Sequence, residues 1–307
     1  MPDIVISEFM DEAAVRDLGP RDVLYDPALA DRPEDLRAAV ADARALIVRN
    51  RTEVREVLLE AAPRLRVVGR LGVGLDNIDV RACAARGVTV CPATGANDVS
   101  VAEYVIAAAL ILLRGAFSAS DQVAAGAWPR NRLIGREISG KRLGLVGFGA
   151  IARETAKRAA ALGMNVAAYD PYVPGDSPAF AGASRLDLDA LLGSADVLSL
   201  HVPLTPETRH MIDAGALARM KPDAVLVNAA RGGVVDEPAL AAALRAGRLA
   251  GAELDVFETE PLGADRGALF AGLANVILTP HVAGVTVESN VRVSRVTVEN
   301  VLRHLGG

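Results

Sequence analysis

The last third of the chain carries polar residues that could bind a carboxylate and move a proton. They are Arg231, Asp255, Glu260 and His281. Arginine can hold a carboxylate and polarise a neighbouring carbonyl group. Histidine can exchange a proton with an oxygen near neutral pH, and a carboxylate beside it keeps the imidazole protonated. Hydride transfer at C2 of a 2-oxo acid needs this combination, with Arg231 as the binding cation, His281 as the acid and Glu260 as its carboxylate partner.

A glycine-rich motif in the middle of the chain could hold a dinucleotide. The sequence Gly147–Ala152 (GFGAIA) directly follows the apolar run Leu143–Val146 and opens a predicted helix over Ile151–Leu162. Gly147 permits a tight turn, and Gly149 lets the backbone approach a pyrophosphate at the helix N-terminus. An alanine at the third glycine position still allows close packing of helix and strand.

An acidic residue follows the next predicted strand. Asp170 comes 23 residues after Gly147, where a carboxylate can accept hydrogen bonds from ribose hydroxyls and repel a 2′-phosphate. This spacing predicts NAD as the cofactor in preference to NADP. The simpler alternative is an ordinary strand–helix turn followed by a surface aspartate.

Short runs rich in valine, isoleucine and leucine alternate with helical stretches, which is typical of parallel sheets covered on both faces. In the first hundred residues, strands are predicted at Asp3–Ser7, Val23–Tyr25, Ala45–Arg49, Leu65–Val68 and Val88–Cys91, with helices at Pro33–Ala43 and Thr52–Ala61. A second series, at Leu143–Val146, Val166–Tyr169, Val197–His201, Val225–Asn228, Gly251–Asp255 and Val276–Leu278, predicts about six strands of a doubly wound sheet. Ligands bind beyond the carboxyl ends of such strands, so the polar residues above should lie at one edge of this sheet.

Two long helices complete the predicted elements. Ser100–Arg114 is almost wholly apolar and is expected to be buried within a domain or against another subunit. The final helix, about Val285–His304, follows the second sheet and is expected to dock back on the first domain. Residues 115–140, which contain the only tryptophan, are interpreted as a connecting arm.

Composition excludes several classes of protein. Of the 307 residues, 51% are hydrophobic and 23% charged, which rules out a disordered or collagen-like chain. The longest unbroken apolar run has ten residues, whereas a membrane-spanning helix needs about 20, and no signal peptide is recognisable. A net charge of −5 with scattered basic residues argues against nucleic acid as a partner. The histidines lack metal-ligand spacing, and the two cysteines are expected to be buried thiols in a cytoplasmic protein.

Several stretches of the chain together resemble the D-isomer-specific 2-hydroxyacid dehydrogenase family, which includes phosphoglycerate dehydrogenase. They are Gly69–Asp79, Asn97–Glu103, Gly140–Ala152, Ser199–Thr208, Asn228–Asp236, Gly251–Pro261 and Thr279–Gly284. The resemblance implies an α/β fold of two doubly wound parallel-sheet domains. A Rossmann cofactor domain, residues 98–280, would be inserted in a flavodoxin-like substrate domain formed by residues 1–97 and 281–307, and no regulatory domain is expected after residue 307.

The resemblance also implies roles for individual residues. Arg231, Glu260 and His281 are the catalytic three, and Glu260 excludes the formate dehydrogenase branch, which has glutamine at that position. The residues implied to contact NAD are Gly147, Gly149, Ala150, Ile151, Asp170, His201, Pro203, Thr208, Ala229, Arg231, Asp255 and His281, with Asp255 holding the nicotinamide amide. The residues implied to contact the substrate are Gly72, Val73, Gly74, Arg231 and His281, with the backbone of the first three receiving the carboxylate.

Substrate choice is predicted from the first domain. Arg49 and Arg51 follow the third predicted strand, and positions i and i+2 of an extended chain share a face, so both could point at a second anionic group. The alternative is two solvated arginines before a helix. The run from Asp3 to Ala96 is similar to the sulfolactate dehydrogenases of this family, which makes oxidation of 3-sulfolactate to 3-sulfopyruvate the first expectation. A 3-phosphoglycerate dehydrogenase and a glyoxylate or hydroxypyruvate reductase are the alternatives.

A different class of function also fits part of the pattern. Some members of the family bind NAD and act as corepressors, so an NAD-sensing binding protein without turnover is the alternative to an enzyme. The complete Arg–Glu–His set favours the enzyme. The apolar helix and the arm around Trp128 predict a homodimer formed through the cofactor domain.

Overall fold

The computed structural model describes residues 2–175 and 177–306, and the chain divides into two compact units. Unit 1 combines the chain up to Asn97 with the chain from Val285 onward, and unit 2 holds Asp98–Gly284. Each unit has its own parallel sheet with helices on both faces.

The second boundary between the units falls after residue 284, where the sequence placed it after residue 280. The carboxylate of Asp255 accounts for the difference, because it accepts hydrogen bonds from the amides of Val282 and Ala283 at 2.8 Å each. These bonds keep the turn that follows the last strand in unit 2.

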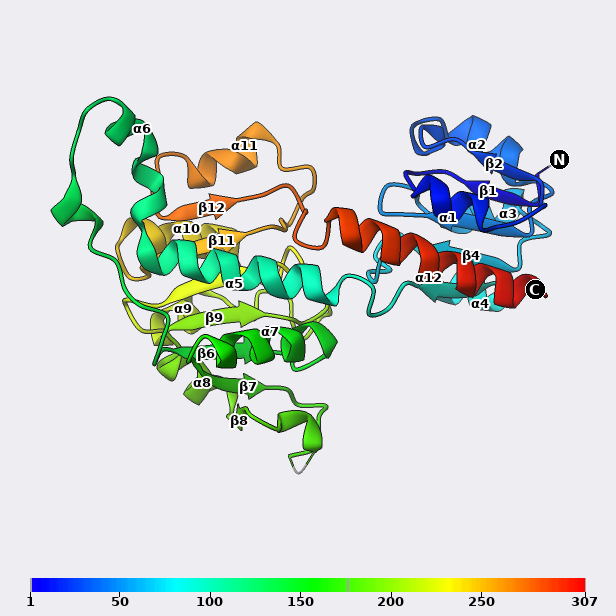
Figure 1. The fold of residues 1–307 in the computed structure, drawn as a ribbon. Helices are drawn as coiled ribbons and strands as arrows, with labels where there is room; N and C mark the ends of the chain where they lie inside the picture. The colour runs from blue at the N-terminus through cyan, green and yellow to red at the C-terminus, as the bar shows by residue number, and fades with distance from the viewer. Residues whose placement is uncertain (1, 176, 307) are drawn as a thin grey trace. The chain divides into compact units, whose positions relative to one another are not determined.

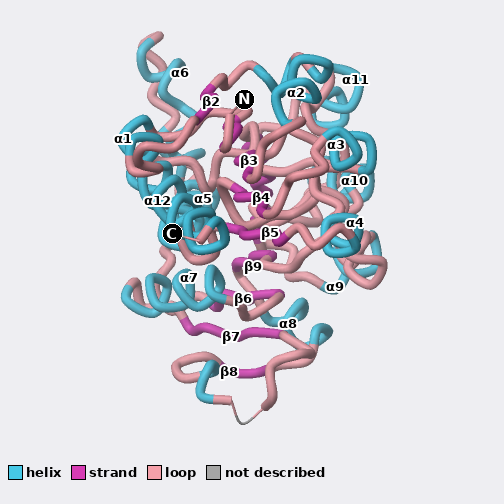
Figure 2. Tube along the Cα trace, turned by 90° about the vertical axis from the view of Figure 1, so that its right-hand side faces the viewer, coloured by secondary structure: helices cyan, strands magenta, loops and turns pink. Residues whose placement is uncertain are grey.

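Unit 1 is built on a five-stranded parallel sheet in the order β2-β1-β3-β4-β5. The strands are β1 Ile4–Ile6, β2 Val23–Tyr25, β3 Ala45–Val48, β4 Val67–Arg70 and β5 Thr89–Pro92. The helices are α1 Glu12–Arg16, η1 Leu29–Asp31, α2 Pro33–Val40, α3 Glu56–Ala61, α4 Val80–Ala85 and α12 Val287–Leu305. Figure 2 shows this sheet with α1 and α12 on one side and α2, α3 and α4 on the other. All five predicted strands are present, with bounds shifted by up to two residues.

The final helix α12 docks on the sheet of unit 1, as its position after the second sheet predicted. It begins with a capping box, in which the Thr286 side chain and the Ser289 side chain each bond the other residue's backbone. Its buried residues Val293 and Val301 pack with β1, β3 and β4. The approach is so close that a Cβ at Gly69 would lie 2.7 Å from the side chain of Val301, so β4 needs glycine at this position.

Unit 2 contains a seven-stranded parallel sheet in the order β12-β11-β10-β9-β6-β7-β8. The strands are β6 Arg142–Val146, β7 Asn165–Tyr169, β8 Ser184–Arg185, β9 Val197–Leu200, β10 Val225–Asn228, β11 Gly251–Leu254 and β12 Val276–Leu278. Six of them were predicted, and β8 was missed because it is an exposed two-residue edge strand without an apolar run. The order reverses between β6 and β9, which is where doubly wound sheets bind ligands.

Helices of unit 2 cover both faces of this sheet. Figure 1 shows α5 and α7 in front of the strands and α8, α9 and α10 behind them. The helices are α5 Asp98–Arg114, η2 Ala116–Ala119, α6 Ser120–Ala124, η3 Arg130–Leu133, α7 Ala150–Ala161, η4 Pro178–Phe180, α8 Leu188–Ser194, α9 Ala214–Arg219, α10 Glu237–Arg245, α11 Ala264–Gly267 and η5 Ala268–Phe270. The expected connecting arm thus consists of three short helical turns and loops.

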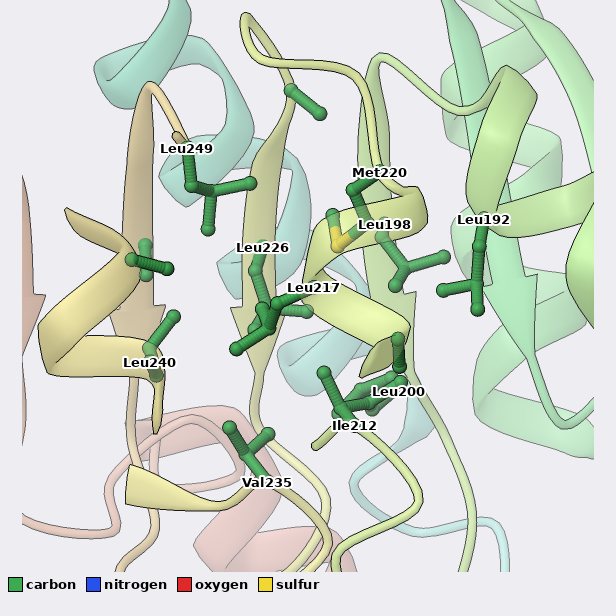
Figure 3. Packing of buried hydrophobic residues seen from close by; sticks show 14 of the residues in the cluster. Leu192, Leu198, Leu200, Ile212, Leu217, Met220, Leu226, Val235, Leu240 and Leu249 are labelled. Carbon is green, nitrogen blue, oxygen red and sulfur yellow. The ribbon is translucent and has the colours of Figure 1, made fainter. Parts of the chain in front are cut away.

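The core behind the sheet is filled by leucine, valine and alanine side chains. Figure 3 shows Leu198, Leu200 and Leu226 from the sheet packed against Leu217 of α9 and Leu240 of α10, all buried. Burial of such side chains is the main source of stability in a fold of this kind.

Two further expectations from the sequence concern the cysteines and membrane-spanning helices. Both cysteines, Cys83 and Cys91, are free and buried, as expected, and burial raises the pKa of each thiol. No single described helix is long and apolar enough to cross a membrane, and α5 reaches that length and composition only together with Ala116–Ala124, from which it is bent by 64°.

Candidate active site

The predicted site residues of unit 2 gather at one edge of its sheet. All seven strands run parallel, so their carboxyl ends meet at the same edge. The residues that follow these ends are Gly147 after β6, Asp170 after β7, His201 after β9, Arg231 after β10, Asp255 after β11 and His281 after β12. The fold therefore places residues that are up to 134 positions apart in the sequence (281 minus 147) at the same edge of the sheet.

The glycine-rich turn has the shape that a pyrophosphate requires. Gly147 has φ of +87°, and a Cβ there would lie 2.5 Å from the backbone oxygen of His201, so only glycine fits. A Cβ at Gly149 would meet nothing within 4 Å, which leaves the N-terminus of α7 open. Gly149 is the N-cap of α7 and provides no side-chain cap, so amides at Ala150 and Ile151 face an open helix end suited to an anion.

Asp170 is held against this turn. One carboxylate oxygen accepts a hydrogen bond from the Phe148 amide at 2.8 Å and the other accepts one from the Tyr172 amide at 2.9 Å. The carboxylate therefore braces the glycine turn in addition to standing at the end of β7. Each oxygen retains a further lone pair for a hydroxyl donor, so this geometry is compatible with the ribose contact inferred from the sequence.

The remaining residues implied to contact NAD lie in the loops after β9 and β10. Burial lowers the pKa of His201 to about 4, so this imidazole is neutral near pH 7. Thr208 donates a hydrogen bond from its hydroxyl to the backbone oxygen of Pro203 at 2.6 Å, which shapes the loop after β9. Ala229 follows β10 directly. The open helix end, the glycine turn and the acidic residue after β7 together fit a dinucleotide.

His281 and Glu260 form a direct pair. Nδ1 of His281 lies 2.7 Å from one carboxylate oxygen of Glu260, and the other oxygen accepts a hydrogen bond from the Phe257 amide at 3.0 Å. Burial opposes ionisation of Glu260, but the hydrogen bonds from His281 and Phe257 outweigh it, so the pKa of Glu260 is lowered. Glu260 is thus a carboxylate that faces the imidazole.

The backbone of His281 is fixed as firmly as its side chain. Its φ is +55°, a conformation that side-chain-bearing residues adopt rarely. The His281 amide donates to the backbone oxygen of Asp255 at 2.8 Å, while the Asp255 carboxylate binds the next two amides. Strain of this kind persists only where the surroundings enforce it.

Arg231 lies in the loop after β10, beside the segment that carries Glu260. The loop is shaped by Asn228, whose side chain donates to the Arg231 backbone oxygen at 3.0 Å. A Cβ at Gly232 would lie 1.8 Å from the Phe257 backbone oxygen, so the two loops pack backbone to backbone. The charge of Arg231 contributes to the lowered pKa of Glu260. Cation, carboxylate and imidazole are therefore assembled for binding an anion and moving a proton.

In unit 1, the predicted substrate residues lie at the carboxyl edge of its own sheet. Gly72, Val73 and Gly74 follow β4, and φ of Gly72 is +141°. Arg49 follows the neighbouring strand β3, and its Nη2 donates to the side-chain oxygen of Asn290 at 2.9 Å. Burial lowers the pKa of Arg49, while Glu8 opposes this effect.

The two arginines predicted to act together have different partners. Arg49 bonds Asn290 near the start of α12, whereas Arg51 forms an ion pair with Asp31 of η1 on an exposed surface. The helix predicted from Thr52 begins only at Glu56, because the amides of residues 49–52 donate to the Glu8 carboxylate and these residues form a loop. Positions i and i+2 share a face only in extended chain, so the loop removes the basis for that prediction.

Comparisons with known proteins agree with one another. The family model of the D-isomer specific 2-hydroxyacid dehydrogenase NAD binding domain matches residues 106–283. The chain is 57% identical to (S)-sulfolactate dehydrogenase of Chromohalobacter salexigens, over 100% of this chain and 99% of that protein. The chain belongs to the D-isomer specific 2-hydroxyacid dehydrogenase family. This 2-hydroxyacid dehydrogenase is an NAD-dependent oxidoreductase that transfers a hydride between nicotinamide and C2 of a small 2-hydroxy acid.

More distant members of the 2-hydroxyacid dehydrogenase family also match over the whole chain. D-3-phosphoglycerate dehydrogenase of Mycobacterium leprae is 43% identical, over 100% of this chain but 57% of that protein. The crystal structure of D-lactate dehydrogenase from Aquifex aeolicus, complexed with NAD and lactic acid, matches with a TM-score of 0.86 and 31% identity, over 99% of this chain and 96% of that one. The family and the two-sheet α/β fold inferred from the sequence are therefore confirmed.

One residue that organises unit 1 of the dehydrogenase was not predicted from the sequence. Glu8, which is 3% exposed, accepts hydrogen bonds from the amides of all four residues 49–52, at 2.8–3.2 Å. Burial opposes its ionisation, but hydrogen bonds from Thr52, Arg49 and Arg51 outweigh this, so the pKa of Glu8 is lowered. The only local signal was an acidic residue shortly after a short apolar strand.

Replacing Glu8 by glutamine should lower the free energy of unfolding by about 1.5–3 kcal/mol near neutral pH, because hydrogen bonds to a charged acceptor are weakened. The folded-state pKa is lowered, so this contribution is present above the unfolded pKa of about 4.3 and is lost as pH falls through the folded pKa. Denaturant unfolding of wild type and Glu8→Gln from neutral to acid pH measures the difference. Glu60→Gln, at an exposed position of α3, is the control, and a gap that does not shrink in acid contradicts the assignment.

Proposed function

We propose that this dehydrogenase oxidises (S)-sulfolactate to sulfopyruvate, with Arg231, Glu260 and His281 as its catalytic residues. The observation that carries the substrate is the 57% identity to a sulfolactate dehydrogenase over the full length of both chains. The pairing of His281 with Glu260 beside the Arg231 loop supports the residue roles.

Each residue has one task in the proposed reaction. Arg231 binds the carboxylate and the C2 oxygen, which lowers the energy of the developing carbonyl. His281 takes the hydroxyl proton through Nε2, because Nδ1 is occupied by Glu260. The Glu260 carboxylate stabilises the imidazolium that forms and holds the ring in one orientation. When bound, NAD supplies the nicotinamide that accepts the hydride from C2.

The proposed cofactor contacts divide between backbone and side chains. Gly147, Gly149, Ala150 and Ile151 would bind the pyrophosphate through the turn and the open end of α7. Asp170 would accept from the adenosine ribose, and Asp255 would hold the nicotinamide amide. His201, Pro203, Thr208 and Ala229 would line the loops after β9 and β10.

Replacing His281 by alanine should lower kcat by at least about 10²-fold, since general acid–base assistance contributes 10²–10⁴-fold. Arg231→Ala should cost as much, because the C2 oxygen loses its cation. Steady-state NADH absorbance measures both, and NADH fluorescence checks that the cofactor still binds. His304→Ala in α12 is the matched control. Retention of kcat in His281→Ala would refute the assignment.

The second anionic group of the substrate would be bound in unit 1. Arg49 is half-buried and tethered to Asn290, whereas Arg51 is paired with Asp31. A half-buried guanidinium discriminates between anions more strongly than one already neutralised on the surface. We therefore assign the sulfonate to Arg49 and a smaller, long-range role to Arg51, with Gly72–Gly74 receiving the carboxylate.

A panel of (S)-sulfolactate, 3-phosphoglycerate, D-glycerate, D-malate and D-lactate tests the substrate. We expect the highest kcat/KM with sulfolactate. Arg49→Met should raise KM for sulfolactate at least about tenfold and change KM for D-lactate much less, because lactate has no second anion. Arg51→Met should have the smaller effect. Preference for 3-phosphoglycerate would retain the mechanism and replace the substrate, and equal effects on lactate would exclude Arg49.

We also propose that the protein is a cytoplasmic homodimer formed through unit 2. Free, buried thiols suit a reducing compartment. Large apolar side chains stand exposed on α5 and the arm, with Trp128 and Ile134 each 81% exposed and Phe117 65% exposed. Burying them against a second copy would remove apolar area from water.

Light scattering coupled to size-exclusion chromatography should give twice the mass of one chain. Trp128→Asp together with Ile134→Asp should shift the species toward one chain, since charges in an apolar interface are costly. A wild-type protein that elutes as a single chain at micromolar concentration would contradict the dimer.

A further inference from the structure

A row of four side chains in unit 2, with a buried carboxyl group at each end, leads from the middle of β11 to the turn that carries His281. The Tyr104 hydroxyl, on α5, lies 2.6 Å from Oε1 of Glu253 and within hydrogen-bond distance of Oγ1 of Thr279. Thr279 Oγ1 lies 2.6 Å from Oδ1 of Asp255. Glu253 and Asp255 are at most 1% exposed and two residues apart in sequence. Glu253 contacts Tyr104 of α5, the helix that lies in front of the sheet in Figure 1.

The row has one more hydrogen bond than its hydroxyl protons can supply. Three oxygen–oxygen contacts join Glu253 to Tyr104, Tyr104 to Thr279, and Thr279 to Asp255. Each contact needs one proton between its two oxygens, and the two hydroxyl groups bring one proton each. The third proton must therefore belong to one of the two carboxyl groups.

The surroundings decide which carboxyl group carries that proton. Asp255 accepts two backbone hydrogen bonds, from Val282 and Ala283 at 2.8 Å, and such bonds favour the ionised form. Oε2 of Glu253 is buried and has no hydrogen-bond partner among the described residues. An ionised Glu253 would leave a buried charge uncompensated, which is far more costly than a neutral carbonyl oxygen.

We propose that Glu253 is a neutral carboxylic acid in the folded enzyme and acts as a positioning residue for the turn that carries His281. Glu253 donates to Tyr104, Tyr104 donates to Thr279, and Thr279 donates to Asp255. All three bonds point the same way and end on the one ionised carboxylate, which holds the amides after His281. The proton count rests on contacts within unit 2 alone, while the consequence for His281 rests on the proposed function.

The electrostatics of the row are consistent with this arrangement. Burial raises the pKa of Glu253 to about 8; the hydrogen-bond contact with Tyr104 opposes this rise and the charge of Asp255 reinforces it. Among the described residues, these two are the titratable groups that act on Glu253. Its register neighbours, Val227 on β10 and Ile277 on β12, carry no charge. Burial raises the pKa of Tyr104 as well, so its hydroxyl keeps its proton.

Loss of the Glu253 proton to solvent would reverse the row. The Tyr104 hydroxyl would turn to donate to the new carboxylate, and Thr279 would lose its donor. The hydrogen bond from Thr279 to Asp255 would then weaken. The turn after β12, which Asp255 holds, should therefore be less well ordered at alkaline pH. This links the protonation of a side chain that touches no reactant to the placement of His281.

Isotope-edited infrared spectroscopy of the folded wild-type enzyme, slightly below neutral pH, tests the proton directly. The carbonyl band of a protonated carboxylic acid should shift when glutamate is labelled with carbon-13, and part of it should disappear in Glu253→Gln. A band that shifts only with labelled aspartate would place the proton on Asp255. No difference between wild type and Glu253→Gln would mean that Glu253 is ionised, and either result overturns the proposal without any measurement of turnover.

The pH dependence of stability provides a second test. A folded-state pKa above the unfolded value means that the folded protein holds one more proton between about pH 4.3 and about pH 8. Wild-type stability should therefore fall with rising pH in this window relative to Glu253→Gln, and the difference should level off above it. The exposed Glu299→Gln is the control and should show no such slope. A flat or opposite difference for Glu253→Gln contradicts a neutral Glu253.

Kinetics of two near-isosteric variants test the positioning role. Glutamine can still donate to Tyr104, whereas methionine fills the space without a donor. Glu253→Met should lower kcat by about tenfold, which is the effect of one lost buried hydrogen bond. Glu253→Gln should keep most of the wild-type kcat and should lack the change in kcat at alkaline pH that we assign to loss of the Glu253 proton. Equal kcat in the two variants would show that Glu253 only fills space.

Discussion

The geometry at the edge of unit 2 depends on one buried carboxylate. Asp255 accepts the amides of Val282 and Ala283 and the hydroxyl of Thr279, while its backbone oxygen accepts the amide of His281. These four bonds hold His281 at a positive φ, and they keep the turn after β12 within unit 2. A buried side chain whose acceptors are matched by this many donors holds the turn firmly, so strain at the histidine can persist.

The parallel strands of unit 2 bring the turn that carries His281 together with the other residues of the candidate site. The strand register brings the loops after β6, β10, β11 and β12 to one edge, and the reversal of strand order beside β6 opens space for a dinucleotide. Glycine then sets the closest approaches. Gly147 lets the turn after β6 pack on the backbone of His201, directly after β9, and Gly232 lets the Arg231 loop touch the segment that leads to Glu260.

Unit 1 also contains a buried carboxylate that binds backbone amides and thereby positions a functional loop. The Glu8 carboxylate organises a loop that contains a cation, so that Arg49 is held near Asn290 while its neighbour Arg51 turns to Asp31. In both units a buried carboxylate binds backbone amides, and the side chains that carry the proposed chemistry stand on the segment it holds. Removal of such an acceptor leaves several backbone amides without a hydrogen-bond partner at once. The loss of one of these carboxylates should therefore destabilise the fold more than the loss of a single hydrogen bond.

Much of this protein can be predicted from its sequence. Short apolar runs located eleven of the twelve strands in the described part of the chain. The motif after β6 together with Arg231, Glu260 and His281 indicated the reaction, because strand ends and glycine turns are encoded locally. Tertiary structure decided what depends on partners distant in sequence. Glu8 binds amides more than 40 positions away in the sequence, and Tyr104 contacts Glu253, which is 149 positions away. Burial and long-range hydrogen bonds determine the charge of such groups, and neither is visible in a local pattern.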